Sequence, residues 1–193
     1  MKIRLNNVRL AFPALFEAKT VNGEGEPAFS HFPPPLIYAS FILASDHPQL
    51  DEIRKAMEKM GAEKWGAKWP QVKKEIETKD RMALHDGDTK GDYEGYAGNY
   101  FISARNKTRP TIFDRDGKTP LVQADGRPYA GCYVNAAIEL WCQDNNFGKR
   151  INASLRGVQF LKDGEAFAGG GVASEDDFED LSADEEGADP LFA

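Results

Sequence analysis

The segment GCYVNAAIELWCQ, residues 131–143, decides the class of fold because its apolar residues recur at every second position. One face of the predicted strand carries Cys132, Val134, Ala136, Ile138 and Leu140. The other face carries Tyr133, Asn135, Ala137, Glu139 and Trp141. Because successive side chains of a strand point to opposite faces, the pattern predicts a long strand with one buried face and one outward face.

A second strand is predicted at residues 150–162, RINASLRGVQFLK, and its apolar phase changes once. The apolar positions are Ile151, Ala153 and Leu155, followed after Gly157 by Val158 and Phe160. A phase change of one residue at a glycine indicates a β-bulge, which bends a strand as the closure of a barrel requires.

The upstream part of the chain is predicted to alternate strands with one helical segment. We expect strands at 3–12, 36–44, 99–105, 111–113 and 121–123, helices at about 47–60 and 67–83, and exposed loops at 21–35 and 84–98. Pro13 is expected to end the first strand and Gly61 the first helix. The chain is therefore predicted to be mainly β, with residues 1–171 forming a five-stranded OB-fold-like barrel that carries a helical insertion at about 47–83.

Charge divides the chain into two unequal parts. Residues 174–193 hold nine acids and no Lys or Arg, which leaves 22 acids against 24 bases, or about +2, for residues 1–173. We expect residues 172–193 to be a flexible acidic tail, because they combine high charge with few apolar groups and follow three glycines at 169–171. The tail residues expected to bind partners are Phe178, Leu181, Asp189, Leu191 and Phe192.

Aromatic and basic residues interleave in the second half of the body. Single-stranded nucleic acid is bound by such mixtures, because rings stack on bases while cations follow the phosphates. The candidate DNA-binding residues are Tyr93, Tyr96, Phe101, Arg105, Lys107, Arg109, Arg127, Tyr129, Tyr133, Trp141, Lys149, Arg150 and Arg156. The alternative to base stacking is that these rings belong to the core. For Tyr133 and Trp141, the alternative is that the helical insertion covers them.

Motifs for catalysis, metal binding and membrane insertion are missing from the sequence. The acidic stretches at 85–88 and 114–117 do not fit a calcium loop and are interpreted as turns. Cys132 and Cys142 lie ten residues apart in one predicted strand, too far for a disulfide, and fit no zinc spacing. We expect no cofactor and no metal. With no run of about 18 apolar residues and no signal-peptide pattern, a cytoplasmic location is expected.

Three short stretches carry a resemblance to a known family. Residues 129–135 (YAGCYVN), 153–160 (ASLRGVQF) and 163–167 (DGEAF) resemble a phage family of OB-fold single-stranded-DNA-binding proteins, first catalogued as a domain of unknown function. The similarity extends from the first strand to Gly171. It implies single-stranded DNA as the ligand, no catalysis, no metal and a homodimer. The acidic tail resembles those of replication proteins that recruit partners through it.

Two classes of function follow from these observations. The first is a non-enzymatic protein that binds single-stranded DNA without sequence specificity in phage replication or recombination, with a tail that competes with DNA and recruits replication proteins. The alternative is an acidic interaction module or inhibitor, a DNA mimic whose body binds no DNA. A Mg²⁺-dependent nuclease ranks third. The mildly positive body and the interleaved aromatic and basic residues favour the first class.

Overall fold

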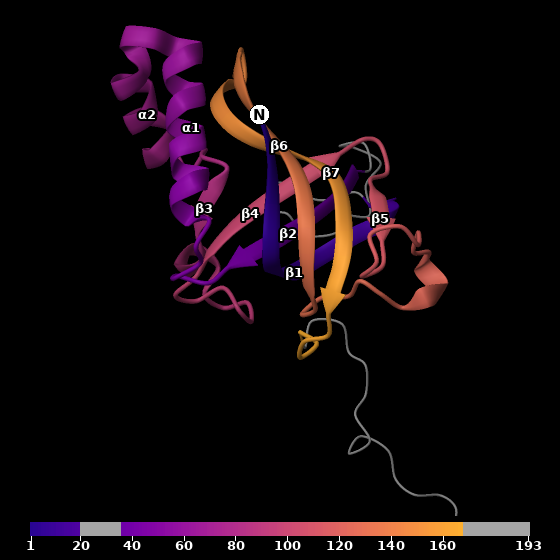
Figure 1. The fold of residues 1–193 in the computed structure, drawn as a ribbon. Coiled ribbons are helices and arrows are strands. Elements are labelled where there is room, and N and C mark those ends of the chain that lie inside the picture. The colour runs from indigo at the N-terminus through magenta and orange to yellow at the C-terminus, as the bar shows by residue number, and fades with distance from the viewer. Residues whose placement is uncertain (20–35, 168–193) are drawn as a thin grey trace, which may run out of the picture.

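Five strands close on themselves in the computed structural model, which describes residues 1–19 and 36–167 (Figure 1). They are β1 (Lys2–Lys19), β2 (Leu36–Leu43), β4 (Tyr100–Asn106), β6 (Tyr133–Asn145) and β7 (Gly148–Lys162). Neighbours pair in the order β1, β2, β4, β7, β6 and back to β1, and only the β4–β7 pair among these is parallel. This order confirms the predicted OB-fold-like barrel. Two short strands, β3 (Leu84–Asp86) and β5 (Thr111–Phe113), extend the sheet beside β4 and β7.

The core contains the apolar faces of β6 and β7. The side chains of Val134, Ala136, Ile138 and Leu140 are almost completely buried, as the alternation predicts. Along the β6–β7 ladder, Ala137 lies opposite Gly157 but Ile138 lies opposite Leu155, so Arg156 is an extra residue on β7. The predicted β-bulge is therefore present. Cys132 and Cys142 are free thiols.

β1 does not end at Pro13, in contrast to the prediction. The strand pairs with β6 through its first half, changes partner near Arg9, and pairs with β2 through its second half. Its register on β2 shifts between Ala11 and Ala14, and Phe12 between them has a left-handed φ of 46°. A bulge tolerates a proline in a strand and redirects the neighbouring side chain, which places Phe12 on the outer surface.

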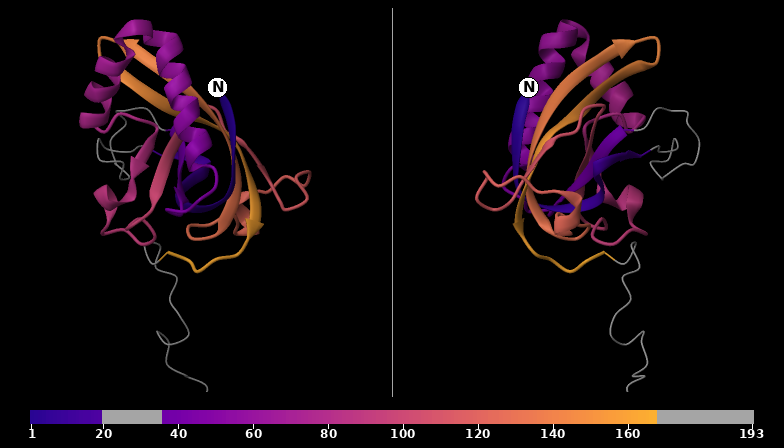
Figure 2. Two further views of the ribbon diagram at one scale, coloured as in Figure 1. Left: turned by 60° about the vertical axis from the view of Figure 1, so that its left-hand side comes forward. Right: turned by 90° about the vertical axis from the view of Figure 1, so that its right-hand side faces the viewer.

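The helical insertion consists of α1 (Leu50–Trp65), a 3₁₀ turn η1 (Gly66–Lys68) and α2 (Trp69–Thr78). The two helices stand as a pair beside one end of the barrel, next to the β6–β7 hairpin (Figures 1 and 2). Gly61 does not end α1, because the helix continues to Trp65. An added Cβ at Gly61 would lie 2.4 Å from the ring of Trp69, so this glycine allows α2 to approach. The second helix is also shorter than predicted.

Two segments predicted as a loop and a strand differ from the prediction. Within 84–98, the structure has β3, a 3₁₀ turn η2 (Gly87–Lys90) and a series of turns that bury Gly87 and Tyr96. Residues 121–123 do not form a strand, and the 3₁₀ turn η3 (Gln123–Asp125) begins at Gln123. The predicted loop at 21–35 lies outside the described residues, as do the glycines at 169–171 and the acidic tail.

Candidate nucleic-acid interface

A groove of about 530 Å³ runs over the outer surface of β2, β4 and the start of β7. Its floor consists of outward-facing strand residues: Tyr38, Ser40, Ser103, Arg105, Arg150 and Asn152. Its walls include Phe12, Asp80, Arg81, His85, Lys90 and Tyr93. The barrel brings these residues together from six separate segments, so no continuous motif encodes the groove.

Strand register extends the floor of the groove across four strands. Tyr38 on β2 lies opposite Arg105 on β4, and Arg105 lies opposite Ser154 on β7. On β6, the indole Nε1 of Trp141 donates a hydrogen bond to the Ser154 hydroxyl at 3.0 Å. The Trp141 side chain remains 43% exposed, so its ring is accessible beside the groove. This row joins two rings and a cation across the barrel surface.

Three arginines meet in the groove without carboxylate partners. Arg81, Arg105 and Arg150 form no ion pair with any described residue. The pKa of Arg150 is lowered, first by burial and then by the nearby charges of Arg81 and Arg105. Like charges placed this close repel one another, and a bound polyanion would relieve the repulsion.

A fourth cation, Lys90, lies among aromatic rings at the groove wall. Its Nζ is 5.3 Å from the ring centroid of Phe101 and 5.9 Å from that of Phe12. Burial lowers the pKa of Lys90, and the negative charge of Asp80 partly offsets this effect. Lys90 therefore adds a partly desolvated positive charge next to exposed aromatic surface.

Exposed rings occur at both ends of the groove. At one end, Phe12 and Tyr93 are 39% and 40% exposed and meet edge to face with centroids 5.1 Å apart. At the other end, Phe147 at the tip of the β6–β7 hairpin is 83% exposed. The hairpin lies against Arg81, because an added Cβ at Gly148 would be 2.5 Å from the Arg81 guanidinium.

The helical insertion supports this hairpin. The indole of Trp65 in α1 donates a hydrogen bond to the carboxylate of Asp144 at 2.8 Å, and the thiol of Cys142 lies 3.7 Å from the carbonyl oxygen of Met60. Asp144 also pairs with Lys149 at 3.9 Å. The insertion therefore supports the hairpin that carries Phe147 and does not cover Trp141, which was the alternative considered for that ring.

The structure brings only some of the predicted site residues together. Tyr93, Arg105 and Arg150 line the groove, and Trp141 continues its floor. Lys107 and Arg109 follow the end of β4 and are exposed. The guanidinium of Arg109 lies 5.3 Å from the ring centroid of Phe16.

Two predicted stacking residues, Tyr96 and Phe101, are corrected to core residues. Their side chains are 1% and 3% exposed, and their rings pack on each other with centroids 5.0 Å apart. Burial raises the pKa of Tyr96 to about 12. Neither ring has a free face for a base. Tyr96 packs against the ring of Phe12, and Phe101 stacks on the ring of His85.

Four of the remaining predicted residues lie away from the groove and have partners in the body, whereas Lys149 precedes the groove residue Arg150 and pairs with Asp144. Arg127 pairs with Asp114 at 2.8 Å, and Arg156 pairs with Glu139. The Tyr129 hydroxyl bonds to the Asp163 carboxylate and the Gly164 carbonyl oxygen, each at 3.0 Å. Tyr133 carries Lys162 over its ring at 4.7 Å. These contacts stabilise the turns and strand ends around β6 and β7.

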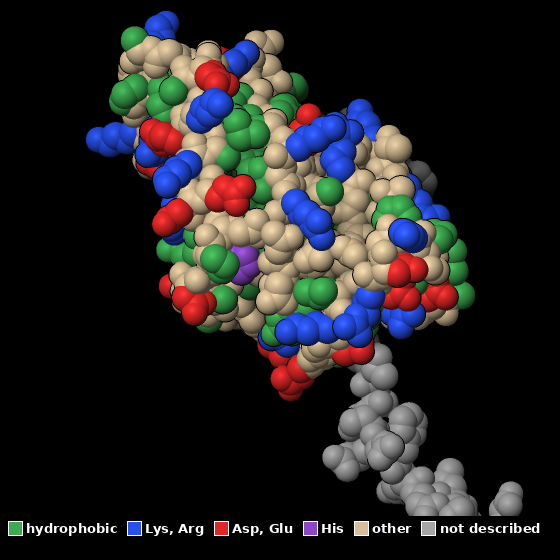
Figure 3. Space-filling model, viewed as in Figure 1, with side chains coloured by type: hydrophobic (Ala, Val, Ile, Leu, Met, Phe, Trp, Pro, Cys, Tyr) green, Lys and Arg blue, Asp and Glu red, His purple; other side chains and the backbone are tan. Residues whose placement is uncertain are grey.

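A second basic area lies on the outer face of β1, β6 and β7, where Lys and Arg side chains gather (Figure 3). A shallow hollow there is lined by Lys2, Arg4 and Arg156, together with Glu139 and apolar side chains. It contains no aromatic ring, so it offers phosphates a surface but offers bases no stacking platform.

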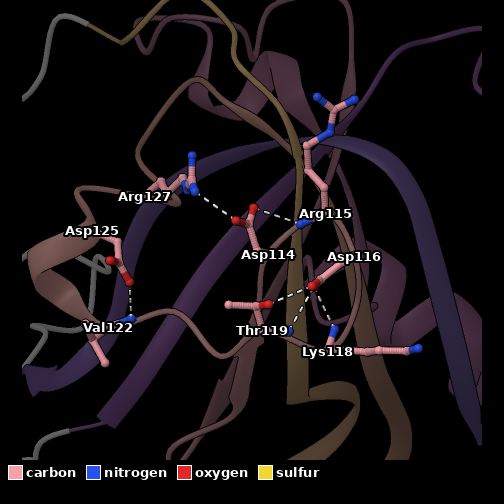
Figure 4. Close-up of polar contacts among 8 residues, drawn as sticks. All are labelled: Asp114, Arg115, Asp116, Lys118, Thr119, Val122, Asp125 and Arg127. Carbon is pink, nitrogen blue, oxygen red and sulfur yellow. Dashed lines mark hydrogen bonds and ion pairs between the residues drawn. The ribbon is translucent and has the colours of Figure 1, made fainter.

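The acidic stretch at 114–117 forms a turn, as predicted (Figure 4). Asp116 accepts hydrogen bonds from the backbone N–H groups of Lys118 and Thr119 and from the Thr119 hydroxyl, and these bonds lower the pKa of Asp116. The Asp114 carboxylate accepts a hydrogen bond from the Arg127 guanidinium. Across residues 1–19 and 36–167, no group of three or more His, Cys, Asp and Glu side chains could hold a metal ion.

Most of the aromatic and charged groove residues that the sequence analysis missed lie upstream of Tyr93. Phe12 was predicted as the last residue of a strand, and Tyr38 lies within the strand predicted at 36–44. Arg81 was assigned to a helix, and Lys90 to an irregular loop. The alternation of Tyr38 and Ser40 with Ile37 and Ala39 was the one local signal for an outward face.

Comparisons with known proteins agree with this picture. A family model described as the single-stranded-DNA-binding protein of Enterobacter phage Enc34 matches residues 1–188. A protein of Acyrthosiphon pisum secondary endosymbiont phage 1, named protein p50, is 49% identical over 191 residues, which cover 96% of this chain and 97% of that protein.

Solved structures are similar to the chain over most of its length. The C-terminally truncated single-stranded-DNA-binding protein of bacteriophage Enc34 is 25% identical with a TM-score of 0.65, covering 86% of this chain and 88% of that chain. The Enc34 protein in complex with single-stranded DNA is 26% identical with a TM-score of 0.63 over the same shares. In the described part of the chain, no helix has the length and apolar character needed to span a membrane.

Proposed function

The chain belongs to the family of the single-stranded-DNA-binding protein of Enterobacter phage Enc34, and we propose that it binds single-stranded DNA without strong sequence preference in the groove over β2, β4 and β7. The resemblance inferred from the three short stretches near the C-terminal end of the body is thereby confirmed. The proposal needs no catalysis, cofactor or metal.

One observation carries the proposal: three arginines that form no ion pair with any described residue lie on the same surface as exposed aromatic rings. Phosphates would follow Arg81, Arg105 and Arg150, while bases would stack on rings such as Tyr93 and Trp141. Stacking contributes about 1–3 kcal/mol per base and tolerates any base, because every base has a π-face. The described lining of the groove has four Lys and Arg side chains against one carboxylate, and this excess of positive charge is consistent with an anionic ligand.

The acidic tail would act in phage DNA replication or recombination by competing with DNA and by recruiting partner proteins. Its starting point supports the competition. Phe167, the last described residue, lies under the Arg9 guanidinium at 4.3 Å and packs on the buried cluster of Tyr96 and Phe101. That cluster also contacts Phe12 at the groove end. The nine carboxylates follow from residue 175 onward, and their attachment to the body near the groove would give them a high effective concentration there.

The alternative, an acidic module or DNA mimic, requires a body that binds no DNA. The groove arginines, which form no ion pair with any described residue, argue against this alternative, since a scaffold for a tail has no need of them. A homodimer, implied by the resemblance, remains a prediction.

The experiment that tests the proposal is a fluorescence-anisotropy titration of the full chain with labelled oligo-dT of increasing length. We expect tight binding that strengthens with length until the oligonucleotide fills the groove and its flanks. Absent binding, or equal affinity for all lengths, would refute the proposal and favour the acidic module.

A further inference from the structure

Among the described residues that line the groove, the cations are accompanied by one carboxylate. Asp80 lies on the wall next to Arg81, and the other charged lining residues are Lys90, Arg105 and Arg150. A carboxylate repels phosphates, so a site that followed only the DNA backbone would be weakened by it. Its place in the groove indicates contact with another part of the nucleotide, the base.

Backbone structure fixes the position of Asp80. The residue follows the end of α2 with a left-handed φ of 49°, and its N–H donates to the Glu77 carbonyl oxygen at 3.0 Å. The next N–H, of Arg81, returns to the Ile76 carbonyl oxygen at 2.7 Å. These bonds close the helix in the manner of a C-terminal cap and present the Asp80 side chain to the groove.

His85 orients the carboxylate. Its Nδ1 lies 2.8 Å from Oδ1 of Asp80, and its ring stacks on Phe101 with centroids 4.9 Å apart and an interplanar angle of 18°. The imidazole is 19% exposed, whereas the Asp80 side chain is 59% exposed. Oδ2 and the remaining lone pair of Oδ1 are therefore available to donors in the groove.

The bases differ in what they offer a carboxylate. Guanine presents two donors side by side, N1–H and the N2 amino group. In adenine and cytosine the amino group lies beside a ring-nitrogen acceptor, and in thymine a single N–H lies between two carbonyl oxygens, which a carboxylate repels. Building on the proposed function, we propose that Asp80 is a base-reading residue that gives one subsite of the groove a preference for guanine.

Two other roles for Asp80 make different predictions. If it only offsets the charge of Lys90, or only orients His85, its removal changes the affinity for every strand by the same factor, whatever the bases. A base-reading role changes the ratio of affinities between strands.

The test uses the full chain and oligo-dT of one length that carries three separated guanines, or three inosines, or none. Inosine lacks the N2 amino group and keeps N1–H. Asp80→Asn and Asp80→Gly suit the left-handed backbone, so both variants are expected to fold. Asp51→Asn, on the exposed face of α1, is the matched control for loss of one carboxylate.

We expect the wild type and Asp51→Asn to bind the guanine-containing strand at least about fivefold more tightly than all-thymine DNA, the low end for a bidentate base contact. Inosine should fall between the two. Asp80→Gly should lose the preference and bind all-thymine DNA more tightly than the wild type does. Equal wild-type affinities, or a preference that survives in Asp80→Gly, would overturn the proposal. Failure of every strand to bind would instead refute the proposed function.

Discussion

Replacement of Arg81, Arg105 and Arg150 together by Gln should remove the phosphate path of the groove. If each arginine contacts one phosphate, the slope of log affinity against log salt should become flatter by about 2, at about 0.7 per contact with single-stranded DNA. If the variant and the wild type bind equally at 1 M salt, the variant should bind about 100-fold more weakly than the wild type at 0.1 M salt. Oligo-dT and oligo-dA should be affected alike.

The triple variant should fold at least as well as the wild type. The three arginines have no ion-pair partner among the described residues, and the pKa of Arg150 is lowered by burial and by its two cationic neighbours. Removing the charges therefore relieves repulsion, and thermal unfolding should show an unchanged or raised Tm.

The charge-matched control replaces Lys2, Arg4 and Arg156, which line the shallow hollow on the β1, β6 and β7 face. Anisotropy titrations at four or more salt concentrations measure both slopes. An unchanged slope in the groove variant, with a flatter slope in the control, would refute the reasoning and place the phosphates on the other face.

Further predictions concern single rings, pH and the tail. Trp141→Ala and Phe147→Ala should each weaken binding to oligo-dT by about 1–3 kcal/mol, the scale of one stacked base, without lowering the Tm; normal binding would show that these rings lie off the path. Because burial lowers the pKa of Lys90, its charge is lost at lower pH than for an ordinary lysine, and as the pH rises wild-type affinity should begin to fall earlier than that of Lys90→Arg. Parallel pH profiles would contradict this. Truncation after Ala173 should raise affinity most at low salt, whereas equal affinities across a salt series would show that the tail does not occupy the groove. A pull-down of replication proteins from infected cells should succeed with the intact chain and fail with Phe192→Ala; equal recovery would exclude Phe192 as an anchor.

The barrel could be predicted from the sequence because its signals are local. Alternation over residues 131–143 predicts a strand, and the phase change at Gly157 predicts a bulge. Each signal spans only a few residues. Gly61 shows the limit of such signals. A glycine near the expected end of a helix suits both a helix stop and a close helix contact, and only the position of Trp69 decides between them.

The binding surface was less predictable because it depends on which distant segments the barrel joins. Tyr93, Arg105 and Arg150 were identified from composition, but composition could not separate them from Tyr96 and Phe101, which the same fold buries. The contribution of Phe12 depends on a change of partner strand and a left-handed residue, neither of which leaves a pattern in the sequence.

The most direct test of the groove as the DNA site is photocrosslinking of the full chain to oligo-dT that contains 5-iododeoxyuridine, with the adducts mapped by mass spectrometry. Iodouracil crosslinks preferentially to rings that stack on it. The account predicts adducts at Phe12, Tyr38 and Tyr93, which line the groove. Adducts confined to Tyr129 or Tyr133, near the start of β6, would contradict it.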